Sequence, residues 1–513
     1  VSLVVGIIFF LYATKYVAFI AVILLNRVWK RNNGNGSKGN GNGITYTNGG
    51  SHYNGIHIHS HPLIPNHNGN NGVNAALGKT SLDGGSRQEP FVSIHLPLYN
   101  EKNVADRLLK ACTSLDYRNY EVIVIDDSTD ETVQVLEKWA HEPKVKILHR
   151  EVRSGFKGGA LNEALKNMDS RTQYVIVFDA DFIPQPDIIQ QFVAQFNGNG
   201  YHNRVNGRNG NGNGNGNGNN GNSKNGNGNG NGYNNVAAVQ GYQWHCLNED
   251  ENWVTRGIRA EYSGSYMIER PCQEYFGLMK MVAGSVYMIK ADVLRKYGWT
   301  TSITEDWELT LRLYADGYKV LYTPLIAVPA ECPSTIERLI RQRMRWSEGH
   351  TANVKKHLRK ILSSSKVSLR EKFEFLYYAP YYLQSVLFLV GGASWIALEI
   401  SNPGQIMDIA RLIVIFNFIS VPLMNIAGLF LEGSTRRSFK GILSSMVLPF
   451  ILAPFQAYSS FKGLLVGEGN WVRTYKTGKI TKCVGTRGMR WVQTIKRLLR
   501  GRRKWTKRPS KQS

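Results

Sequence analysis

Long apolar segments at both ends of the chain constrain its fold more than any other feature. Val1–Leu25 is almost wholly apolar and is followed by Arg27, Lys30 and Arg31. About 20 apolar residues suffice for a helix to cross a bilayer, where open loops and sheet edges are excluded. Because the charges follow the apolar run, this segment is expected to be a transmembrane helix with a cytoplasmic C-terminal end. A cleaved signal peptide would carry its charges first.

Three further apolar segments lie in the last third of the chain, at Leu376–Ile400, Ile409–Leu431 and Ile442–Val466. The first two are long enough to span a bilayer. Basic residues before the first and after the second place both of those ends inside. A third full span would put the basic C-terminal tail outside, and this segment contains Pro449 and Pro454. We therefore expect the third segment to lie in the membrane interface or to re-enter.

Charge and cysteine usage narrow the class of protein further. The net charge is +24, and from Arg473 to Ser513 the chain contains no Asp or Glu. Beside apolar segments, such a tail marks the cytoplasmic face and anionic lipid rather than nucleic acid. The cysteines number 5 and show no CxxC spacing, which argues against a disulfide framework or zinc site and favours a reducing compartment.

Two polar tracts interrupt the chain. Residues 32–88 are rich in Asn, Gly and Ser, and residues 197–235 are nearly a pure Asn-Gly alternation. Such compositions bury too little apolar surface to offset chain entropy, so both tracts are expected to be disordered. His57, His59 and His61 alternate in the first tract and could hold a metal weakly, although a solvated linker is the better interpretation.

Between and after these tracts, short apolar runs alternate with helical patterns. This alternation predicts an α/β domain with a parallel sheet, whose ligands bind at the carboxyl ends of the strands. The expected strands are Phe91–Leu96, Glu121–Ile125, Val145–Leu148, Tyr174–Phe178 and Val236–Val239, with helices at about 101–114 and 158–167.

Paired carboxylates follow two of the predicted strands. Asp179 and Asp181 leave a strand in extended geometry, so both side chains point to one side. Two hard oxygen ligands suit Mg²⁺ or Mn²⁺ bound together with phosphate oxygens, whereas a lone DxD is usually a solvated turn. Asp126 and Asp127 end another strand and are placed to accept hydrogen bonds from a base or ribose. The alternative there is an Asx turn that caps the next helix.

A lysine and a third acidic motif lie at predicted helix starts. Lys157 lies where the Gly-rich turn 155–159 enters a helix, and backbone amides and an ammonium there form an anion site. Alone, it could be an exposed turn lysine. Thr304 is a plausible N-cap for a helix whose first turn contains Asp306, which the helix dipole would keep ionised as a general base requires. The alternative is ordinary stabilisation of the helix N-terminus.

A further helix follows, for which Ser334 and Glu337 predict a capping box. On it, Gln342, Arg345 and Trp346 are spaced i, i+3, i+4 and share one face. Trp346 can stack on the apolar face of a sugar, Arg345 can offset diphosphate charge, and Gln342 can hydrogen-bond hydroxyls. The same spacing would also describe an Arg-rich amphipathic helix at a membrane surface.

Together these motifs resemble the processive family 2 glycosyltransferases, especially cellulose synthase and the plant cellulose-synthase-like mannan and glucan synthases. The likeness covers roughly Phe91–Lys479, and in this order the combination is highly specific. The matching pieces are Asp126-Asp127-Ser128, Lys157-Gly158-Gly159-Ala160-Leu161-Asn162, Asp179-Ala180-Asp181, Thr304-Glu305-Asp306, Gln342-Arg343-Met344-Arg345-Trp346 and the gating-loop-like Trp471-Val472-Arg473-Thr474-Tyr475-Lys476.

The resemblance implies a GT-A (Rossmann-like) glycosyltransferase domain plus α-helical transmembrane segments, and an inverting displacement that needs Mg²⁺ or Mn²⁺. Asp306 is the implied catalytic base. The implied nucleotide and diphosphate contacts are Asp126, Asp127, Lys157, Asp179 and Arg345. The implied metal ligands are Asp179 and Asp181, the implied acceptor contacts are Glu305, Gln342 and Trp346, and the implied gating-loop contacts are Trp471, Thr474 and Lys476.

The expected organisation is a multi-pass membrane protein with a cytoplasmic catalytic domain. Its expected parts are an N-terminal transmembrane helix (1–26), a linker (27–88), the catalytic domain (89–362) with the insertion 197–235, a membrane region (363–466), and a gating-loop-like segment with the basic tail (467–513).

The expected function is transfer of a sugar from UDP-glucose, UDP-N-acetylglucosamine or GDP-mannose to a growing β-linked polysaccharide. The rivals are a single-transfer enzyme that acts on a lipid-linked or polyprenyl phosphate acceptor, and a non-catalytic membrane scaffold that binds anionic lipid or nucleic acid through its tail. Family members usually carry more membrane helices after the gating loop, so a second copy or a partner subunit would be needed to complete a channel. No nucleic-acid partner is expected.

Overall fold

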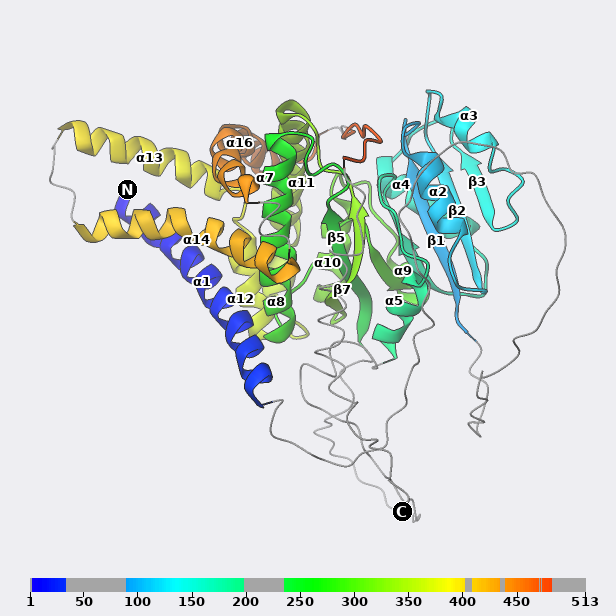
Figure 1. Ribbon diagram of the computed structural model, residues 1–513, viewed down its shortest axis with the longest axis horizontal. Coiled ribbons are helices and arrows are strands. Elements are labelled where there is room, and N and C mark those ends of the chain that lie inside the picture. The colour runs from blue at the N-terminus through cyan, green and yellow to red at the C-terminus, as the bar shows by residue number, and fades with distance from the viewer. Residues whose placement is uncertain are drawn as a thin grey trace, which may run out of the picture.

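The computed structural model describes residues 2–33, 89–197, 235–401, 408–433, 439–469, 471 and 473–481. A central sheet with helices on both faces forms one part of the molecule, and α1, α13 and α14 project from it (Figure 1). The histidines of the first polar tract, nearly all of the 197–235 tract and the tail beyond residue 481 lie outside the described residues.

The first half of the sheet domain alternates strands and helices, as the sequence predicts. The run Tyr120–Asp126 is almost wholly buried because helices cover both faces of the sheet. The elements are β1 (Phe91–Leu98), α2 (Ala105–Thr113), β2 (Tyr120–Asp126), α3 (Thr132–Glu137), β3 (Val145–His149), α4 (Phe156–Asn167), β4 (Thr172–Val177) and α5 (Ile188–Phe196).

The second half completes the sheet and adds the helices that connect it to the membrane region. Its elements are β5 (Val236–His245), α7 (Trp253–Gly264), the π-helix η1 (Ser265–Glu269), α8 (Arg270–Tyr275), β6 (Tyr287–Lys290), α9 (Ala291–Tyr297), α10 (Glu305–Ala315), β7 (Lys319–Ala330), α11 (Ile336–Ser363) and α12 (Leu369–Tyr378).

The sheet has seven strands in the order β3-β2-β1-β4-β6-β5-β7. The strands β1 to β4 are parallel, and β5 pairs in parallel with β7, but β6 runs antiparallel to both β4 and β5. The expectation of a purely parallel sheet was therefore wrong at β6. This strand has only four residues, and its direction depends on how the preceding helices return the chain to the sheet.

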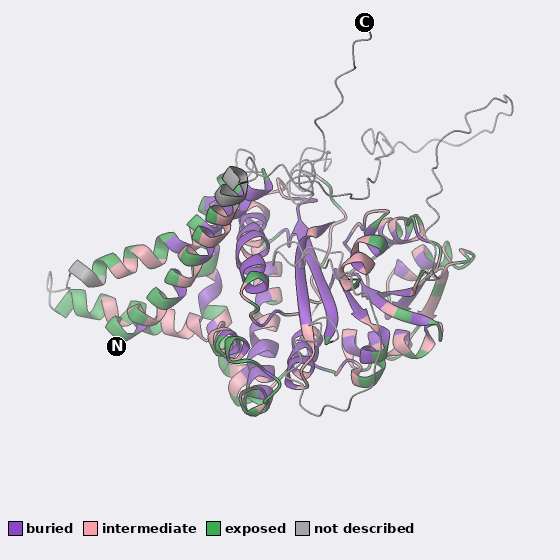
Figure 2. Cartoon of the chain, turned by 90° about the horizontal axis from the view of Figure 1, so that it is seen from below, coloured by how far each residue is buried: buried purple, intermediate pink, exposed green. Residues whose placement is uncertain are grey.

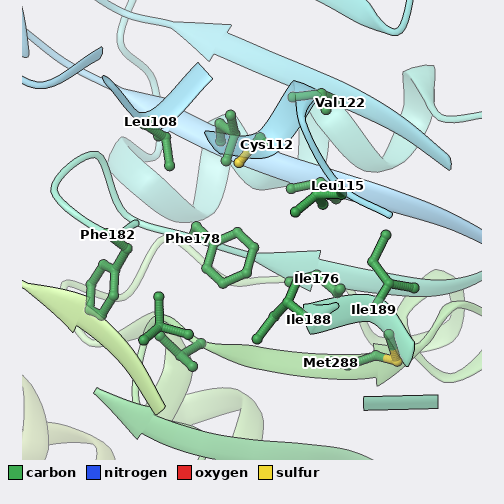
Figure 3. Close-up of a cluster of buried hydrophobic side chains, with 14 of the residues drawn as sticks. Leu108, Cys112, Leu115, Val122, Ile176, Phe178, Phe182, Ile188, Ile189 and Met288 are labelled. Atoms are coloured by element: carbon green, nitrogen blue, oxygen red, sulfur yellow. The ribbon is translucent and has the colours of Figure 1, made fainter. Parts of the chain in front are cut away.

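Alternating side chains of the strands pack into two cores, one on each face of the sheet. Val122 and Val124 of β2 face the core formed with α2 and α5, whereas Ile123 and Ile125 face the core formed with α4, α9 and α10. Phe178, which follows β4, packs near Leu108 and Ile188 in the first core (Figure 3). Each fully buried aliphatic or aromatic side chain contributes about 1.5–3 kcal/mol to folding, so this alternation fixes the strand register.

Among the described residues, four helices are long and apolar enough to cross a membrane. They are α1 (Ser2–Asn33), α13 (Gln384–Ser401), α14 (Asp408–Glu432) and α16 (Lys440–Leu465). Exposed residues are frequent on the projecting helices, whereas buried residues concentrate in the sheet domain (Figure 2). Ile396, Ile400, Leu412 and Ile415 are among the exposed apolar side chains, as expected of a surface that faces lipid.

Two of these helices differ from the expected segments. The segment 376–400 is divided, because α12 ends at Tyr378 and α13 begins at Gln384. The helix α1 continues to Asn33, into the expected linker. The third expected segment forms α16, a single helix that runs unbroken through Pro449 and Pro454 and lies along α7 and α11.

Candidate active site

A cavity of about 860 Å³ opens at the carboxyl ends of β1, β2 and β4 and continues between the membrane helices. Nearly all of the site residues expected from the sequence line it, although they come from distant parts of the chain. These residues are Asp127, Lys157, Asp179, Asp181, Glu305, Asp306, Gln342, Arg345, Trp346, Trp471, Thr474 and Lys476.

Asp126 does not line this cavity, contrary to its expected role as a nucleotide contact. Its carboxylate accepts a hydrogen bond from the backbone N–H of Ser128 at 3.0 Å and lies 2.8 Å from Nδ1 of His149 on β3. The buried carboxylate instead orders the turn that follows β2. Successive residues of a strand point to opposite sides, so only one of the paired aspartates can face the ligand.

Asp127 faces the cavity, and two arginines contact it. Arg150 donates from Nε and Nη2 to the two carboxylate oxygens at 2.6 Å each, a bidentate geometry that keeps Asp127 in place. Nε of Arg153 lies 3.7 Å from Asp127. The guanidinium of Arg153 also stacks between the rings of Tyr99 and Trp471, at 3.9 and 4.2 Å from their centroids.

Lys157 lies on the first turn of α4 and points into the cavity. Its Nζ lies 2.7 Å from Oδ1 of Asp179 and 3.3 Å from Oε1 of Glu305, and donates to the carbonyl of Gly284 at 2.8 Å. Burial lowers the pKa of Lys157, but the two carboxylates outweigh burial and raise it above its ordinary value. The Gly-Gly pair that follows is needed for close packing, since a Cβ at Gly158 would lie 2.0 Å from the carbonyl oxygen of Thr300.

Asp181 is a buried carboxylate with one oxygen engaged and one without a partner. Its Oδ2 accepts from the backbone N–H of Glu331 and from Nζ of Lys476, both at 2.9 Å, whereas Oδ1 is buried and has no hydrogen-bond partner. Burial alone would raise the pKa of Asp181, but the ammonium of Lys476 reverses this and lowers it. The unpartnered anionic oxygen is the kind of ligand that a divalent cation binds. Among the described residues no group of three or more potential ligands gathers, so donor phosphate oxygens would have to complete the coordination.

Asp306 lies in the first turn of α10 and lines the same cavity. Its Oδ1 accepts from the backbone N–H of Trp307 at 2.8 Å. A Cβ at Gly284 would lie 3.1 Å from Oδ2, so the glycine keeps that oxygen accessible. Burial and the neighbouring Glu305 raise the pKa of Asp306 to about 7, against the opposing effect of Lys157. The expectation that the helix dipole keeps this group fully ionised was therefore wrong.

The helix α11 presents its expected face to the cavity. Its N-cap is Thr335, whose hydroxyl accepts from the backbone N–H of Arg338, so the predicted capping box at Ser334 is not formed. Gln342, Arg345 and Trp346 all line the cavity. The guanidinium of Arg345 lies 4.9 Å from the ring centroid of Trp471, and its Nε is buried without a hydrogen-bond partner.

The sequence analysis did not identify several residues that line the same cavity. Tyr99 and Glu101 directly follow β1, and burial raises the pKa of Glu101 to about 8 despite the nearby Arg473. Arg153 and His245 also line it. Because Tyr99, Glu101 and His245 lie at or just beyond the carboxyl ends of strands, the strand-end rule that found the aspartates could have found them.

From these charged groups the cavity extends toward the membrane helices. Aromatic side chains of α7, η1, α12, the loop after α12 and α13 line the cavity. The aromatic residues are Tyr262, Tyr266, Tyr378, Tyr381, Tyr382, Phe388 and Trp395. Their rings offer flat apolar surfaces with a polar atom at the edge, which suits the faces of sugar rings.

Comparison with known proteins assigns the chain to a family. Residues 93–244 match the family described as glycosyl transferase family 2, and residues 230–431 match glycosyl transferase family group 2. The relatives include glucomannan 4-beta-mannosyltransferase 1 of Oryza sativa subsp. japonica, 29% identical over 57% of this chain and 52% of the relative. Another is probable glucomannan 4-beta-mannosyltransferase 10 of Arabidopsis thaliana, 26% identical over 78% of this chain and 67% of the relative.

The chain spans about half the length of several of these relatives, such as 50% of glucomannan 4-beta-mannosyltransferase 2 of Arabidopsis thaliana. Among solved structures, a mannosyltransferase from Pyrobaculum calidifontis in complex with GDP-Man and Mn²⁺ is 18% identical, with a TM-score of 0.45 over 74% of this chain and 89% of that one. The two family matches adjoin one another and together contain the sheet, the carboxylates and α11, and the chain belongs to the family 2 glycosyltransferases of the cellulose-synthase-like type.

Proposed function

We propose that this protein is a membrane-bound inverting glycosyltransferase that extends a β-linked polysaccharide from a nucleotide diphosphate sugar. One observation carries the proposal. A single cavity combines a cationic and carboxylate site for a nucleotide diphosphate with Asp306, a half-buried carboxyl group whose pKa is raised to about 7, and continues along aromatic rings to the membrane helices.

The donor's diphosphate would lie among the cationic side chains. Lys157, Arg345 and Lys476 line the cavity from α4, α11 and the gating-loop segment, so they surround the diphosphate from three directions. Charge-assisted hydrogen bonds from such groups offset the negative charge that builds up on a leaving nucleoside diphosphate. Asp127, held by Arg150, is placed to accept from the nucleoside.

Asp181 and Asp179 would hold Mg²⁺ or Mn²⁺, which supplies further positive charge to the diphosphate. Both residues follow β4 and line the cavity. The buried, unpartnered Oδ1 of Asp181 supports this assignment, because a buried anionic oxygen without a partner is costly.

Asp306 would act as the general base. Its carboxylate takes the proton from the acceptor hydroxyl while that oxygen forms a bond to the anomeric carbon. The bond from the anomeric carbon to the phosphate oxygen breaks at the same time, and its electrons leave with the nucleoside diphosphate. Attack from the side opposite the leaving group inverts the anomeric configuration. A pKa near 7 matches the need of a base that works near neutral pH.

A polymer is favoured over single transfer to a lipid-linked acceptor by the aromatic lining beyond Trp346. One transferred sugar would need one stacking platform, whereas rings extend toward α13. Product length from purified enzyme separates the two functions, since single transfer gives only one added sugar. Nucleotide release from a sugar donor excludes a non-catalytic scaffold.

The donor is the most informative unknown. Relatives of this chain are named glucomannan 4-beta-mannosyltransferases. A screen of GDP-mannose, UDP-glucose and UDP-N-acetylglucosamine for nucleotide release would identify the donor. Turnover of GDP-mannose would support a mannan-type synthase, and turnover of only a UDP-sugar would contradict it.

The catalytic domain and the basic tail are proposed to be cytoplasmic, with α16 in the membrane interface. Both ends of α16 contact the catalytic domain: Gly441 packs against the carbonyl of Arg256, and Lys462 lies 2.9 Å from Glu348. A helix that crossed the bilayer would carry one end away from that domain. A cysteine introduced at Ser510 should resist an impermeant thiol reagent in intact cells, and labelling from outside would contradict this topology.

A further inference from the structure

Glu331 is a buried carboxylate that no step of the proposed reaction uses. It directly follows β7 and is 1% exposed. One carboxylate oxygen accepts from the backbone N–H groups of Thr477 and Gly478, at 3.1 and 3.2 Å, and also lies 3.3 Å from the hydroxyl of Thr477. The other oxygen accepts from Arg107 of α2 at 2.9 Å. A buried charge must be satisfied in this way, so its position depends on these partners.

The main chain of the same residue holds the proposed metal ligand. The N–H of Glu331 donates to Oδ2 of Asp181 at 2.9 Å, and Nζ of Lys476 lies 2.9 Å from that same oxygen. Glu331 therefore touches Asp181 through its backbone and the residues after Lys476 through its side chain.

The segment 473–478, here called the strap, is also docked on α2 and the turn before it. Asn103 donates to the carbonyl of Lys476 at 3.0 Å, and Arg107 donates to the carbonyl of Gly478 at 3.2 Å. Gly478 has a φ of +75°, and a Cβ there would lie 2.6 Å from the carbonyl oxygen of Asn103. Both the backbone conformation and the close approach require glycine at this position.

We propose that Glu331 is a positioning residue that sets the register of the strap relative to Asp181. Its side chain accepts hydrogen bonds from the backbone of Thr477 and Gly478, while its own backbone N–H donates to Asp181. This arrangement brings the ammonium of Lys476 to the metal ligand and the donor diphosphate. The docking of the strap is inferred from the hydrogen bonds described above. Its effect on donor turnover rests on the proposed function.

Docking is measured first, without turnover, by hydrogen–deuterium exchange of the purified full chain. Glu331→Met keeps the side-chain volume but removes both acceptors, and Gly478→Ala disrupts docking from the strap side. Glu337→Met is the matched control, because Glu337 is an exposed carboxylate paired with Arg341 on α11. Both test variants should raise exchange in peptides covering 473–481 by roughly tenfold, as expected for local opening, while peptides of β1 and β2 stay protected.

Unchanged exchange in 473–481 would overturn the proposal, and so would a rise spread over the whole sheet, which would mark Glu331 as merely structural. If Glu331→Met does not fold, Gly478→Ala decides the question alone, because it alters no buried charge.

A double-mutant cycle then tests the kinetic role. Glu331→Met should lower kcat/KM for the donor by roughly tenfold, the scale of one lost charge-assisted hydrogen bond. In the Lys476→Ala background, Glu331→Met should lower kcat/KM little further, because both substitutions act through the same strap. Losses that multiply would overturn the positioning role. If the parent enzyme turns over none of the three donors, the proposed function fails, while the exchange result still decides the docking.

Discussion

Asp181 and Asp306 line the same cavity, yet their pKa values shift in opposite directions. Burial acts to raise both. At Asp181 the ammonium of Lys476 outweighs burial, so the pKa falls below its ordinary value. At Asp306 the neighbouring Glu305 acts in the same direction as burial, and Lys157 offsets this only in part, so the pKa rises to about 7.

The contrast shows that a neighbouring charge decides whether the effect of burial on the pKa of a carboxyl group is reinforced or outweighed. A carboxylate with a lowered pKa remains an anion and suits a cation, whereas one with a pKa near 7 can accept a proton under working conditions. In the proposed function, Asp181 would therefore belong to the donor side of the cavity and Asp306 to the acceptor side.

The largest expected effect comes from the acceptor side. Asp306→Asn should reduce turnover by about a hundredfold to ten-thousandfold, the usual contribution of general base catalysis, while nucleotide affinity changes little. Initial rates and nucleotide calorimetry would measure both. Asp316→Asn, at the C-cap of the same helix, is the control. Retention of more than half the parent rate would remove Asp306 from the mechanism.

A substitution on the donor side should instead weaken the binding of the metal ion. Asp181→Ala should weaken Mn²⁺ binding in the presence of nucleotide by at least about a hundredfold, because even partners of metal ligands cost 10–100-fold. Electron paramagnetic resonance of bound Mn²⁺ reports this directly, with Asp169→Ala as control, because Asp169 pairs with Arg171 and does not line the cavity. Full turnover of the parent enzyme in excess chelator would show that this side has been misassigned.

The pH dependence of turnover tests the acceptor side of the cavity without replacing Asp306. The base acts only when ionised, so the rate should rise with pH through a midpoint of about 7. Since Glu305 helps to raise the pKa of Asp306, Glu305→Gln should move that midpoint to lower pH, whatever it does to the maximal rate. A pH–rate profile of kcat measures the shift. A midpoint that moves upward or stays fixed would contradict the proposed coupling.

The smallest effect is expected from shortening the Asn-Gly tract 197–235, which lies between Asp181 and Asp306 in the sequence. Deleting residues 205–230 should change activity by less than about twofold, because long insertions cost little when they leave the sheet intact. Thermal unfolding and turnover of the deleted form would be compared with the parent. Aggregation or loss of activity would assign the tract a structural or acceptor role.

Much of this site follows from local patterns. The apolar runs that end at Asp126 and just before Asp179 are too short for helices, and parallel strands bring their carboxyl ends to one edge. The motif order also placed Lys157 and Trp346 at the cavity. Local patterns could not show that Asp126 turns away toward His149, because that depends on the pairing of β2 with β3.

The sequence by itself determined the α/β domain, the apolar helices and twelve of the residues that line the cavity, since strand ends and helix faces are set by periods of two and 3.6 residues. Tertiary structure alone decided the antiparallel β6, the raised pKa of Asp306 and the contacts of Glu331 with a strap nearly 150 residues away. The physical reason is that hydrogen-bond pairing and electrostatic shifts depend on distance in space, which residues far apart in the chain acquire only on folding.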